Sequence, residues 1–344
     1  MEKYVLNILD WYQKNKRELP WRKDKEPYHV WISEIMLQQT RIEAVIGYYE
    51  RFMKKLPDIS SLACVKDDVL LKLWEGLGYY NRAHNLKKAA IIIMEEYEGK
   101  FPTTYEEIIK LPGIGDYTAS AIASICFNEK QVTVDGNVMR VFTRFYNDDS
   151  NISKPSTKKM IHDKLLSFCP SDSGDFNEGL MELGEKICLP NGVPKCEICP
   201  LRKGCLANQN GNYFLYPAKA EKKTKEIVPM TVFLLIWNKK VFIQKRGRRG
   251  LLHNLYEFPN VIGIKDEKEV LKIASKYGDV SSIKSSIQYT HVFTHKKWQM
   301  QAYVIFLKQV LSEDMFYSTE DIENNFALPS AFQPFLFQLK EEEK

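Results

Sequence analysis

The sequence predicts a multi-domain protein in which an all-α domain is followed by an α+β domain. Three observations lead to this fold class. Apolar residues recur with the helical period through residues 1–187. Four of the seven cysteines then crowd between residues 188 and 205. After residue 228 the apolar pattern changes to the period of two that strands show.

Length and composition are those of a globular protein with two cores. The chain has 344 residues, of which 44% are hydrophobic and 27% charged. A net charge of +5 is compatible with nucleic-acid binding but does not require it. The sequence has no apolar run of about 18 residues and no signal-peptide core. We expect a cytoplasmic protein (at the nucleoid in a bacterium) without a membrane partner, with domains at 1–215 and 228–344 and a linker at 216–227.

The first domain is expected to consist of helices that prolines separate. It shows no alternation of strands and helices, so a doubly wound sheet is not expected. The pattern predicts helices at residues 5–12, 30–40, 67–75, 83–97, 117–127, 137–146 and 157–168.

The segment LPGIG at 111–115 predicts a tight turn that opens the helix at 117–127. Gly113 and Gly115 can adopt backbone conformations that a side chain would forbid. A glycine turn before a helix leaves backbone N–H groups free for an anion such as a phosphate. The alternative is an ordinary corner between two helices.

Glu34 is the first candidate for acid–base chemistry. It lies in the predicted helix at 30–40, next to apolar residues such as Trp31 and Ile35. Loss of hydration raises the pKa of a carboxyl group, as a general acid near neutral pH requires. The alternatives are a glutamate paired with an arginine or one that faces water.

Asp135 is the second candidate. In the segment VDGNV it stands where the N-cap of the helix at 137–146 is expected. Local N–H donors and the helix N-terminus would hold it ionised and depress its pKa. Alone it could be only a cap, but one raised and one depressed carboxylate form a pair suited to cleaving a glycosidic bond.

Four cysteines are spaced to bind one metal centre. Spacers of seven, two and five residues separate them, which allows zinc or a four-iron cluster. The remaining cysteines, at 64, 126 and 169, are expected in the core. The four candidate ligands are Cys188, Cys196, Cys199 and Cys205.

Together these features resemble the endonuclease III superfamily of DNA glycosylases, and within it the MutY-type adenine DNA glycosylases. The resemblance covers about residues 5–208. It is carried by the segments LPWR, SEIMLQQT, GLGYYNRAHNL, LPGIG and VDGNVMRV and by the cysteine loop. The resemblance implies a helix–hairpin–helix glycosylase domain with a 4Fe-4S cluster loop. It also implies double-stranded DNA as the partner, and excision of adenine opposite 8-oxoguanine or guanine by a monomer.

The resemblance also implies roles for individual residues. Glu34 would protonate the flipped adenine, and Asp135 would stabilise the cationic sugar. Gly113 and Gly115 would grip a phosphate. Tyr117, Asn137, Arg22 and Glu178 would form or support the adenine pocket. Contact with the lesion, or insertion into the DNA base stack, would fall to Gln39, Thr40, Leu77 and Tyr79. Core packing is the alternative for each pocket and wedge residue.

Two positions depart from relatives in an informative way. Lyase-type relatives carry a lysine where this chain has Tyr117, and tyrosine cannot form a Schiff base. We therefore expect a monofunctional enzyme that leaves an abasic site, with a bifunctional glycosylase/lyase as the alternative. The spacer after Cys188 is one residue longer than is usual in the family. Zinc therefore remains the alternative to the 4Fe-4S cluster.

The second domain resembles the MutT-like (Nudix-like) domain of the same glycosylases. Strands at 232–237 and 241–245 should form a hairpin, followed by a helix at 267–277 that Gly278 ends and strands at 287–294 and 298–307. The REXXEE helix that binds magnesium in catalytic relatives is absent. We expect lesion recognition by the loop of Phe293, Thr294 and His295, in which threonine replaces the usual serine.

Two other classes remain as alternatives. A non-catalytic DNA-binding protein with a structural metal would need the turn and the cysteines, but not Glu34 paired with Asp135. A nucleoside-diphosphate hydrolase would need the missing acidic helix.

Overall fold

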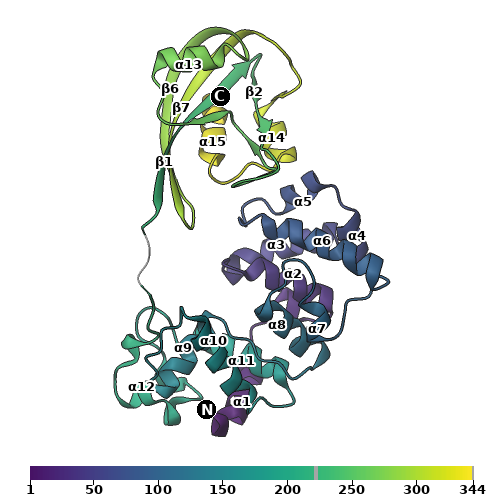
Figure 1. Cartoon of the computed structure of the whole chain (residues 1–344), viewed down its shortest axis with the longest axis vertical. Helices are drawn as coiled ribbons and strands as arrows, with labels where there is room; N and C mark the ends of the chain where they lie inside the picture. Colours follow the sequence, from purple (N-terminus) through teal and green to yellow (C-terminus); the bar gives the residue numbers. More distant parts are fainter. Residues whose placement is uncertain (221–223, 343–344) are drawn as a thin grey trace. The chain divides into compact units, whose positions relative to one another are not determined.

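A computed structural model describes residues 1–220 and 224–342 of the chain (Figure 1). The chain divides into two compact units. The first holds Met1–Val65 and the chain from His84 to residue 220, and the second holds Lys66–Ala83 and the chain from residue 224. The all-α and α+β parts of the predicted fold class are confirmed, while Lys66–Ala83 groups with the second unit.

The predicted linker at 216–227 is described only in part. Residues 221–223 lie outside the described residues. Strand β1 (Glu226–Trp237) begins before the predicted linker ends.

The described residues of the first unit form helices and no strand. Short 3-10 turns join them, among them η2 (Pro20–Arg22). The α-helices are α1 (Val5–Asn15), α2 (Pro27–Leu37), α3 (Ile42–Lys55), α4 (Ile59–Cys64), α6 (Asn81–Glu96), α7 (Tyr105–Ile108), α8 (Asp116–Phe127), α9 (Gly136–Tyr146), α10 (Pro155–Leu166), α11 (Ser173–Lys186) and α12 (Leu206–Gln209); α6 begins in the second unit.

The predicted helix at 30–40 is shifted toward the N-terminus. Pro27 opens α2, as suits a residue without a backbone N–H, and the helix ends at Leu37. Gln39 has φ +62°, a left-handed conformation that an α-helix cannot continue. Gln39 and Thr40 therefore lie in the turn before α3, and the prediction that placed them in a helix was wrong.

The first unit has two lobes (Figure 1). Helices α1, α9, α10 and α11 form one, which we call the α11 lobe, and α2, α3, α7 and α8 form the α2 lobe. Ile8, Phe142, Ile161 and Phe176 lie in the core of the α11 lobe. Helix α11 also contacts α8, so the two lobes meet along it.

The three cysteines expected in the core have different environments. Cys169 is buried among the apolar residues of the α11 lobe, as predicted. Cys126 is only partly buried, and Cys64, the last residue of α4, is exposed. The prediction was wrong for Cys64, because a position at a helix end can point to solvent even within an apolar pattern.

A mixed sheet forms the centre of the second unit. Its strand order is β6-β7-β1-β2-β8, and β5 pairs with β1 beside this path. Strands β1 and β7 run parallel, whereas β6 and β7 form an antiparallel hairpin. The other strands are β2 (Lys240–Phe242), β5 (Asn260–Ile262), β6 (Gly278–Val292), β7 (Lys296–Val310), β8 (Phe316–Tyr317), and the separate pair β3 (Gln244–Lys245) and β4 (Tyr256–Glu257).

Helices cover both faces of this sheet (Figure 1). Side chains alternate along β1, so Val232 and Leu234 pack toward α15 (Gln333–Glu342), and Phe233 and Leu235 pack toward α13 (Glu267–Ala274). The second helix on the α15 face is α14 (Thr319–Asn325), whose Ile322 joins the same core. The sequence pattern did not predict α14 or α15.

Turns of the second unit differ from the prediction in detail. Asn238 and Lys239 have positive φ and form a two-residue turn, so Lys240 belongs to β2. Helix α13 stops at Ala274, and Gly278 opens β6 instead of ending a helix. A Cβ at Gly278 would lie 2.0 Å from the Gln309 carbonyl oxygen, so this close strand approach requires glycine.

Candidate active site and cysteine cluster

A cavity of about 930 Å³ lies in the first unit. Residues of both lobes line it, from η2, α2 and the turn after it, α8, the start of α9, and α11. These residues are far apart in the sequence, and only the folded chain brings them together. The predicted residues that line this cavity are Arg22, Glu34, Gln39, Thr40, Tyr117, Asp135, Asn137 and Glu178.

Glu34 is buried on α2, with 8% of the residue exposed. Burial raises the pKa of its carboxyl group to about 7, as the sequence predicts. Tyr117 opposes this rise through a hydrogen bond, and Arg22 opposes it through its charge. The negative charges of Glu178 and Asp135 add to the rise. A buried carboxyl group with this pKa is protonated in a large fraction of molecules at neutral pH.

Tyr117 at the start of α8 lies beside Glu34. Its hydroxyl donates to the Met181 sulfur at 3.0 Å. Burial, and then the charge of Glu34, raises the pKa of Tyr117 well above its ordinary value, so the phenol stays neutral.

Asp135 is the N-cap of α9, as predicted. Its Oδ1 accepts a hydrogen bond from the Val138 backbone N–H at 2.8 Å, and its Oδ2 accepts one from the Asn137 side chain at 2.8 Å. Burial nevertheless raises the pKa of Asp135, and the hydrogen bonds from Val138 and Asn137 oppose that rise. The expectation of a depressed pKa was wrong, because a cap pattern in the sequence reveals the donors but not the loss of water.

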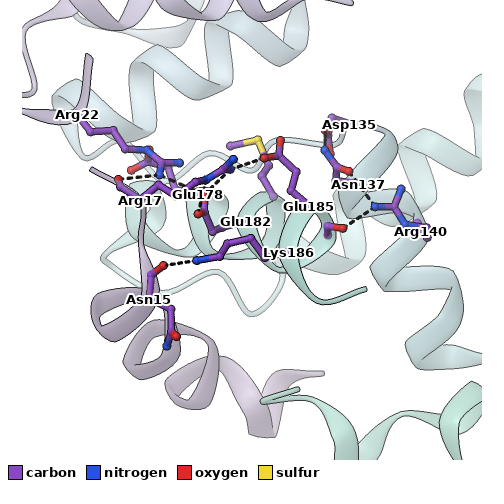
Figure 2. Close-up of polar contacts among 12 residues, drawn as sticks. Asn15, Arg17, Arg22, Asp135, Asn137, Arg140, Glu178, Glu182, Glu185 and Lys186 are labelled. Carbon is purple, nitrogen blue, oxygen red and sulfur yellow. Dashed lines mark hydrogen bonds and ion pairs between the residues drawn. The ribbon is translucent and has the colours of Figure 1, made fainter. Parts of the chain in front are cut away.

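Arg140 supports Asn137 from one turn further along α9 (Figure 2). Its Nη2 donates to the Asn137 side-chain oxygen at 2.9 Å and to the Gly184 carbonyl at 2.8 Å, and its Nε donates to the Cys188 carbonyl at 2.7 Å. Sequence reasoning missed Arg140. The signal was an arginine inside the apolar stretch VMRVF, where a buried charge needs partners.

A network of ion pairs forms another part of the wall (Figure 2). Arg22 Nε donates to Glu178 Oε1 at 2.6 Å, and Arg22 Nη1 donates to Glu182 Oε2 at 3.2 Å. Glu182 also accepts two hydrogen bonds from Arg17, at 2.6 and 2.8 Å. Sequence reasoning missed Arg17 and Glu182, although Glu178 and Glu182 are one helical turn apart on α11.

The LPGIG turn joins α7 to α8. Gly113 has φ +80°, and a Cβ on it would lie 2.6 Å from the Asn85 Cβ, so glycine is required there. Gly115 has φ −105°, and no atom lies within 4 Å of a Cβ built on it. The expectation of a special conformation was therefore wrong for Gly115. It is the N-cap of α8 and has no side chain to bond the first helical N–H groups.

All four predicted metal ligands line one small cavity beside Arg144. Arg144 Nη1 donates to Cys188 Sγ at 3.4 Å. Burial raises the pKa of the Cys199 thiol to about 12. Within the described ranges no set of three or more His, Cys, Asp or Glu side chains is arranged to hold a metal ion. The donor set still fits a thiophilic metal, since four partly buried thiols meet at one cavity that has a cation at its side.

The spacer after Cys188, which is one residue longer than expected, forms a loop whose two ends are joined by a backbone hydrogen bond. Lys195 N–H donates to the Ile187 carbonyl at 2.9 Å, and Gly192 takes φ +76° within the loop. Residues 190–193 of the spacer are exposed, so the additional residue is accommodated in a loop at the surface.

The remaining predicted residues belong to the second unit. Phe293, Thr294 and His295 form the turn between β6 and β7, as predicted, and Phe293 packs on Trp298 with ring centroids 4.7 Å apart. Tyr79 is 47% exposed, and its hydroxyl shares a 2.5 Å hydrogen bond with the Thr294 hydroxyl.

Leu77 has a different environment from Tyr79. It is buried, and its carbonyl accepts a hydrogen bond from Arg82 at 2.9 Å.

Among the described residues, no helix is long and apolar enough to cross a membrane.

A helical unit with a glycine hairpin and a cavity that holds a protonatable carboxyl group beside a capped carboxylate has the features expected of a DNA glycosylase. Comparison with family models agrees. Residues 32–171 match the HhH-GPD superfamily of base excision DNA repair proteins, and residues 231–338 match the NUDIX domain.

Individual relatives are more specific. The chain is 38% identical over 303 residues to "Adenine DNA glycosylase" of Buchnera aphidicola subsp. Acyrthosiphon pisum, covering 86% of this chain and 85% of that protein. It is 37% identical over 302 residues to "Adenine DNA glycosylase" of Arabidopsis thaliana, covering 76% of this chain and 48% of that protein. The chain belongs to the adenine DNA glycosylase family.

A solved structure gives the same fold. The structure of a thermostable thymine-DNA glycosylase is similar with a TM-score of 0.55 at 30% identity, over 60% of this chain and 95% of that one. The fold class and the enzyme class predicted from the sequence are thereby confirmed.

Proposed function

We propose that this enzyme removes adenine opposite 8-oxoguanine or guanine in double-stranded DNA by hydrolysing the N-glycosidic bond. The observation that carries the proposal is the pairing of Glu34, whose pKa is about 7, with Asp135 on the wall of one cavity. The names of the curated relatives support adenine as the base. The base must leave the stack to reach these groups, because its reacting atoms are inaccessible inside a duplex.

Glu34 is the general acid. In its protonated form it donates a proton to a ring nitrogen of the flipped adenine, which makes the base a better leaving group. The neutral Tyr117 hydroxyl beside it keeps the carboxyl group in place.

Asp135 stabilises the positive charge that develops on the sugar as the bond breaks, or traps the sugar covalently before water attacks. It acts in its ionised form. The Asn137 and Val138 hydrogen bonds favour this form and hold the carboxylate in one orientation.

The reaction ends at an abasic site. A lyase needs an amine that attacks the sugar, and the corresponding position here is Tyr117. Covalent trapping by borohydride, abolished by replacing a single lysine, would contradict this assignment.

The other predicted residues bind the substrate. Arg22 and Glu178 support the adenine pocket, while Gln39 and Thr40 contact the lesion strand from the turn after α2. Gly113 and Gly115 present backbone N–H groups to a phosphate. The lesion is recognised, or the base stack is opened by an inserted side chain, by residues of the second unit: Leu77, Tyr79, Phe293, Thr294 and His295. The sequence of this unit lacks a REXXEE helix, which favours lesion recognition over hydrolysis.

The four cysteines hold a 4Fe-4S cluster, with zinc as the alternative. Such a cluster would stabilise the fold of the loop at 188–205. This loop carries Lys195, Arg202 and Lys203, which would contact the DNA backbone. The protein would act as a monomer in the cytoplasm, at the nucleoid if the source is bacterial.

A single-turnover assay tests the substrate assignment. Enzyme in excess is mixed with duplexes that carry adenine opposite 8-oxoguanine, guanine or thymine, and free adenine is quantified. We expect release from the first two and none from the third. Absence of adenine release from the first duplex would contradict the proposed function.

A further inference from the structure

Arg22 stands between two carboxylates of α11. Its Nε donates to Glu178, its Nη1 donates to Glu182, and its Nη1 is also 3.4 Å from the Arg17 carbonyl. Tyr12 donates to the second Glu178 oxygen at 2.8 Å. The position of the Arg22 charge on the cavity wall is thus determined by contacts that do not involve the substrate (Figure 2).

Glu182 is the central acceptor of this arrangement. Its side chain is fully buried, whereas those of Arg17 and Arg22 are 26% and 16% exposed. Burial alone would raise the pKa of Glu182, but hydrogen bonds from Arg17 and the charge of Arg22 hold that pKa below its ordinary value. A buried carboxylate is costly unless its oxygens are paired, and here three hydrogen bonds satisfy them.

We propose that Glu182 is a positioning residue of the glycosylase reaction, which with Arg17 fixes Arg22 beside Glu178 on the wall of the active-site cavity. This inference rests on the proposed function. Glu182 lines the same cavity but has both carboxylate oxygens bonded to the two arginines, so it acts through Arg22 and holds the segment after α1 against α11.

The consequence for Glu34 is electrostatic. Arg22 lowers the pKa of Glu34 and Glu178 raises it, so their balance depends on where Arg22 is held. The ion pairs join three carboxylates, including Glu185, to two guanidinium groups, which leaves one negative charge uncompensated. Loss of the Glu182 charge would favour the ionised form of Glu34 and reduce the protonated acid at a given pH.

The other groups that face Glu34 do not change in this comparison. They are Tyr117 and Cys126 from α8, Asp135 at the start of α9 and Glu178 from α11. Arg41 and Glu43 at the start of α3 line the same cavity. A shift that follows a change at Glu182 alone therefore reports on Arg22 and on the charge next to it.

The test compares wild type with Glu182→Gln. Single-turnover adenine release is measured from pH 5.5 to 8.5 with saturating enzyme. In parallel, the protonated carboxyl infrared band that Glu34→Gln removes is followed against pH in both backgrounds. We expect the Glu34 transition to move to lower pH and the rate above pH 7 to fall by about 10²-fold, with a smaller loss in acid.

Lys186→Gln is the matched control. Lys186 donates to the Asn15 carbonyl at 2.9 Å, so it joins α11 to the end of α1 without reaching Arg22. It should keep both the rate profile and the infrared transition. If Glu182→Gln and Lys186→Gln have the same rate profile and the same infrared transition, Glu182 only stabilises the packing of α11 against the segment after α1. That result would overturn the proposal.

Glu182→Asp decides the question if Glu182→Gln does not fold. Aspartate keeps the buried charge for Arg17 but is one methylene too short to hold both guanidinium groups. We expect a folded protein with a reduced rate, and an unchanged rate would overturn the proposal. If wild type released no adenine, the proposed function would fail, and the infrared transition would still decide whether Glu182 positions Arg22.

Discussion

The Asn137 side chain donates a 2.8 Å hydrogen bond to one oxygen of Asp135, whose other oxygen caps helix α9. One carboxylate thereby caps the start of helix α9 and lines the active-site cavity at the same time. Because asparagine is as good an N-cap as aspartate, the two roles of this position can be separated experimentally.

Asp135→Asn should keep the fold and lose the activity. The amide oxygen can still accept from Val138, while the hydrogen bond from the Asn137 side chain is lost, so the unfolding midpoint should fall less than in a variant without the cap. The neutral amide cannot stabilise the cationic sugar, so adenine release should fall at every pH. Asp135→Ala serves as the comparison and should also lose about 1 kcal/mol of stability through the missing cap. Full activity of Asp135→Asn would contradict the assignment.

Glu34→Gln should stabilise the protein at neutral and alkaline pH. The pKa of Glu34 rises from the ordinary 4.5 to about 7 on folding. Between these values the folded state binds the extra proton, so the unfolding free energy falls as pH rises and levels off above about 7. The variant lacks this penalty and should gain about 3 kcal/mol relative to wild type at pH 8, and almost nothing at pH 4. Unfolding midpoints across this range measure the effect, and a constant difference between the two proteins would argue against a buried, titrating Glu34.

Gly113→Ala and Gly115→Ala should differ. Alanine at position 113 would adopt a left-handed conformation, which costs about 1–2 kcal/mol, and would contact Asn85. Position 115 has free space and ordinary backbone angles, so its variant should lose only the small difference between glycine and alanine at an N-cap, less than Gly113→Ala loses. If a phosphate approaches the N-terminus of α8, Gly115→Ala should weaken duplex binding by fluorescence anisotropy. Equal destabilisation of both variants would contradict the turn geometry.

The local features of the active site could be predicted from the sequence, and the long-range ones could not. Glu34 was predictable because it stands among apolar residues, and Asp135 because VDGNV has the form of an N-cap. Glu182 and Arg17 were missed because their pairing depends on how α1 packs against α11, which helical periodicity does not show. The pKa of Asp135 was predicted in the wrong direction for a related reason, since burial is a tertiary property.

The same limit applies to the fold. The period of two predicted β1, β6, β7 and the hairpin partner of β1 at 241–245, where β2 and β3 lie, but it did not predict β4, β5, β8 or the helices α14 and α15. Those helices are held mainly by packing on the sheet, where Phe332 and Phe335 are fully buried. Residues 66–83 group with the second unit through long-range contacts such as the hydrogen bond from the Leu328 N–H to Glu75, which the sequence pattern does not show.

Cys199→Ser should remove the metal centre. In the absence of a metal, burial keeps the pKa of the Cys199 thiol at about 12, so this thiol is a poor ligand unless a metal displaces its proton. A 4Fe-4S cluster predicts visible absorption in the wild-type protein and its loss in the variant, together with a lower unfolding midpoint. A colourless wild-type protein that contains stoichiometric zinc would support the alternative metal. Cys64→Ser, at an exposed position outside the four-cysteine cavity, is the control and should keep the absorption.

The central claim is that Glu34 protonates an adenine that has left the duplex. The most direct measurement is the single-turnover rate of adenine release from a duplex with adenine opposite 8-oxoguanine, for wild type and Glu34→Gln, across pH 5.5 to 8.5. If this claim holds, release by wild type declines as pH rises through about 7. Release by the variant is about 10²–10⁴-fold slower and has no remaining pH dependence in this range. A Glu34→Gln enzyme as fast as wild type, with the same pH profile, would contradict it.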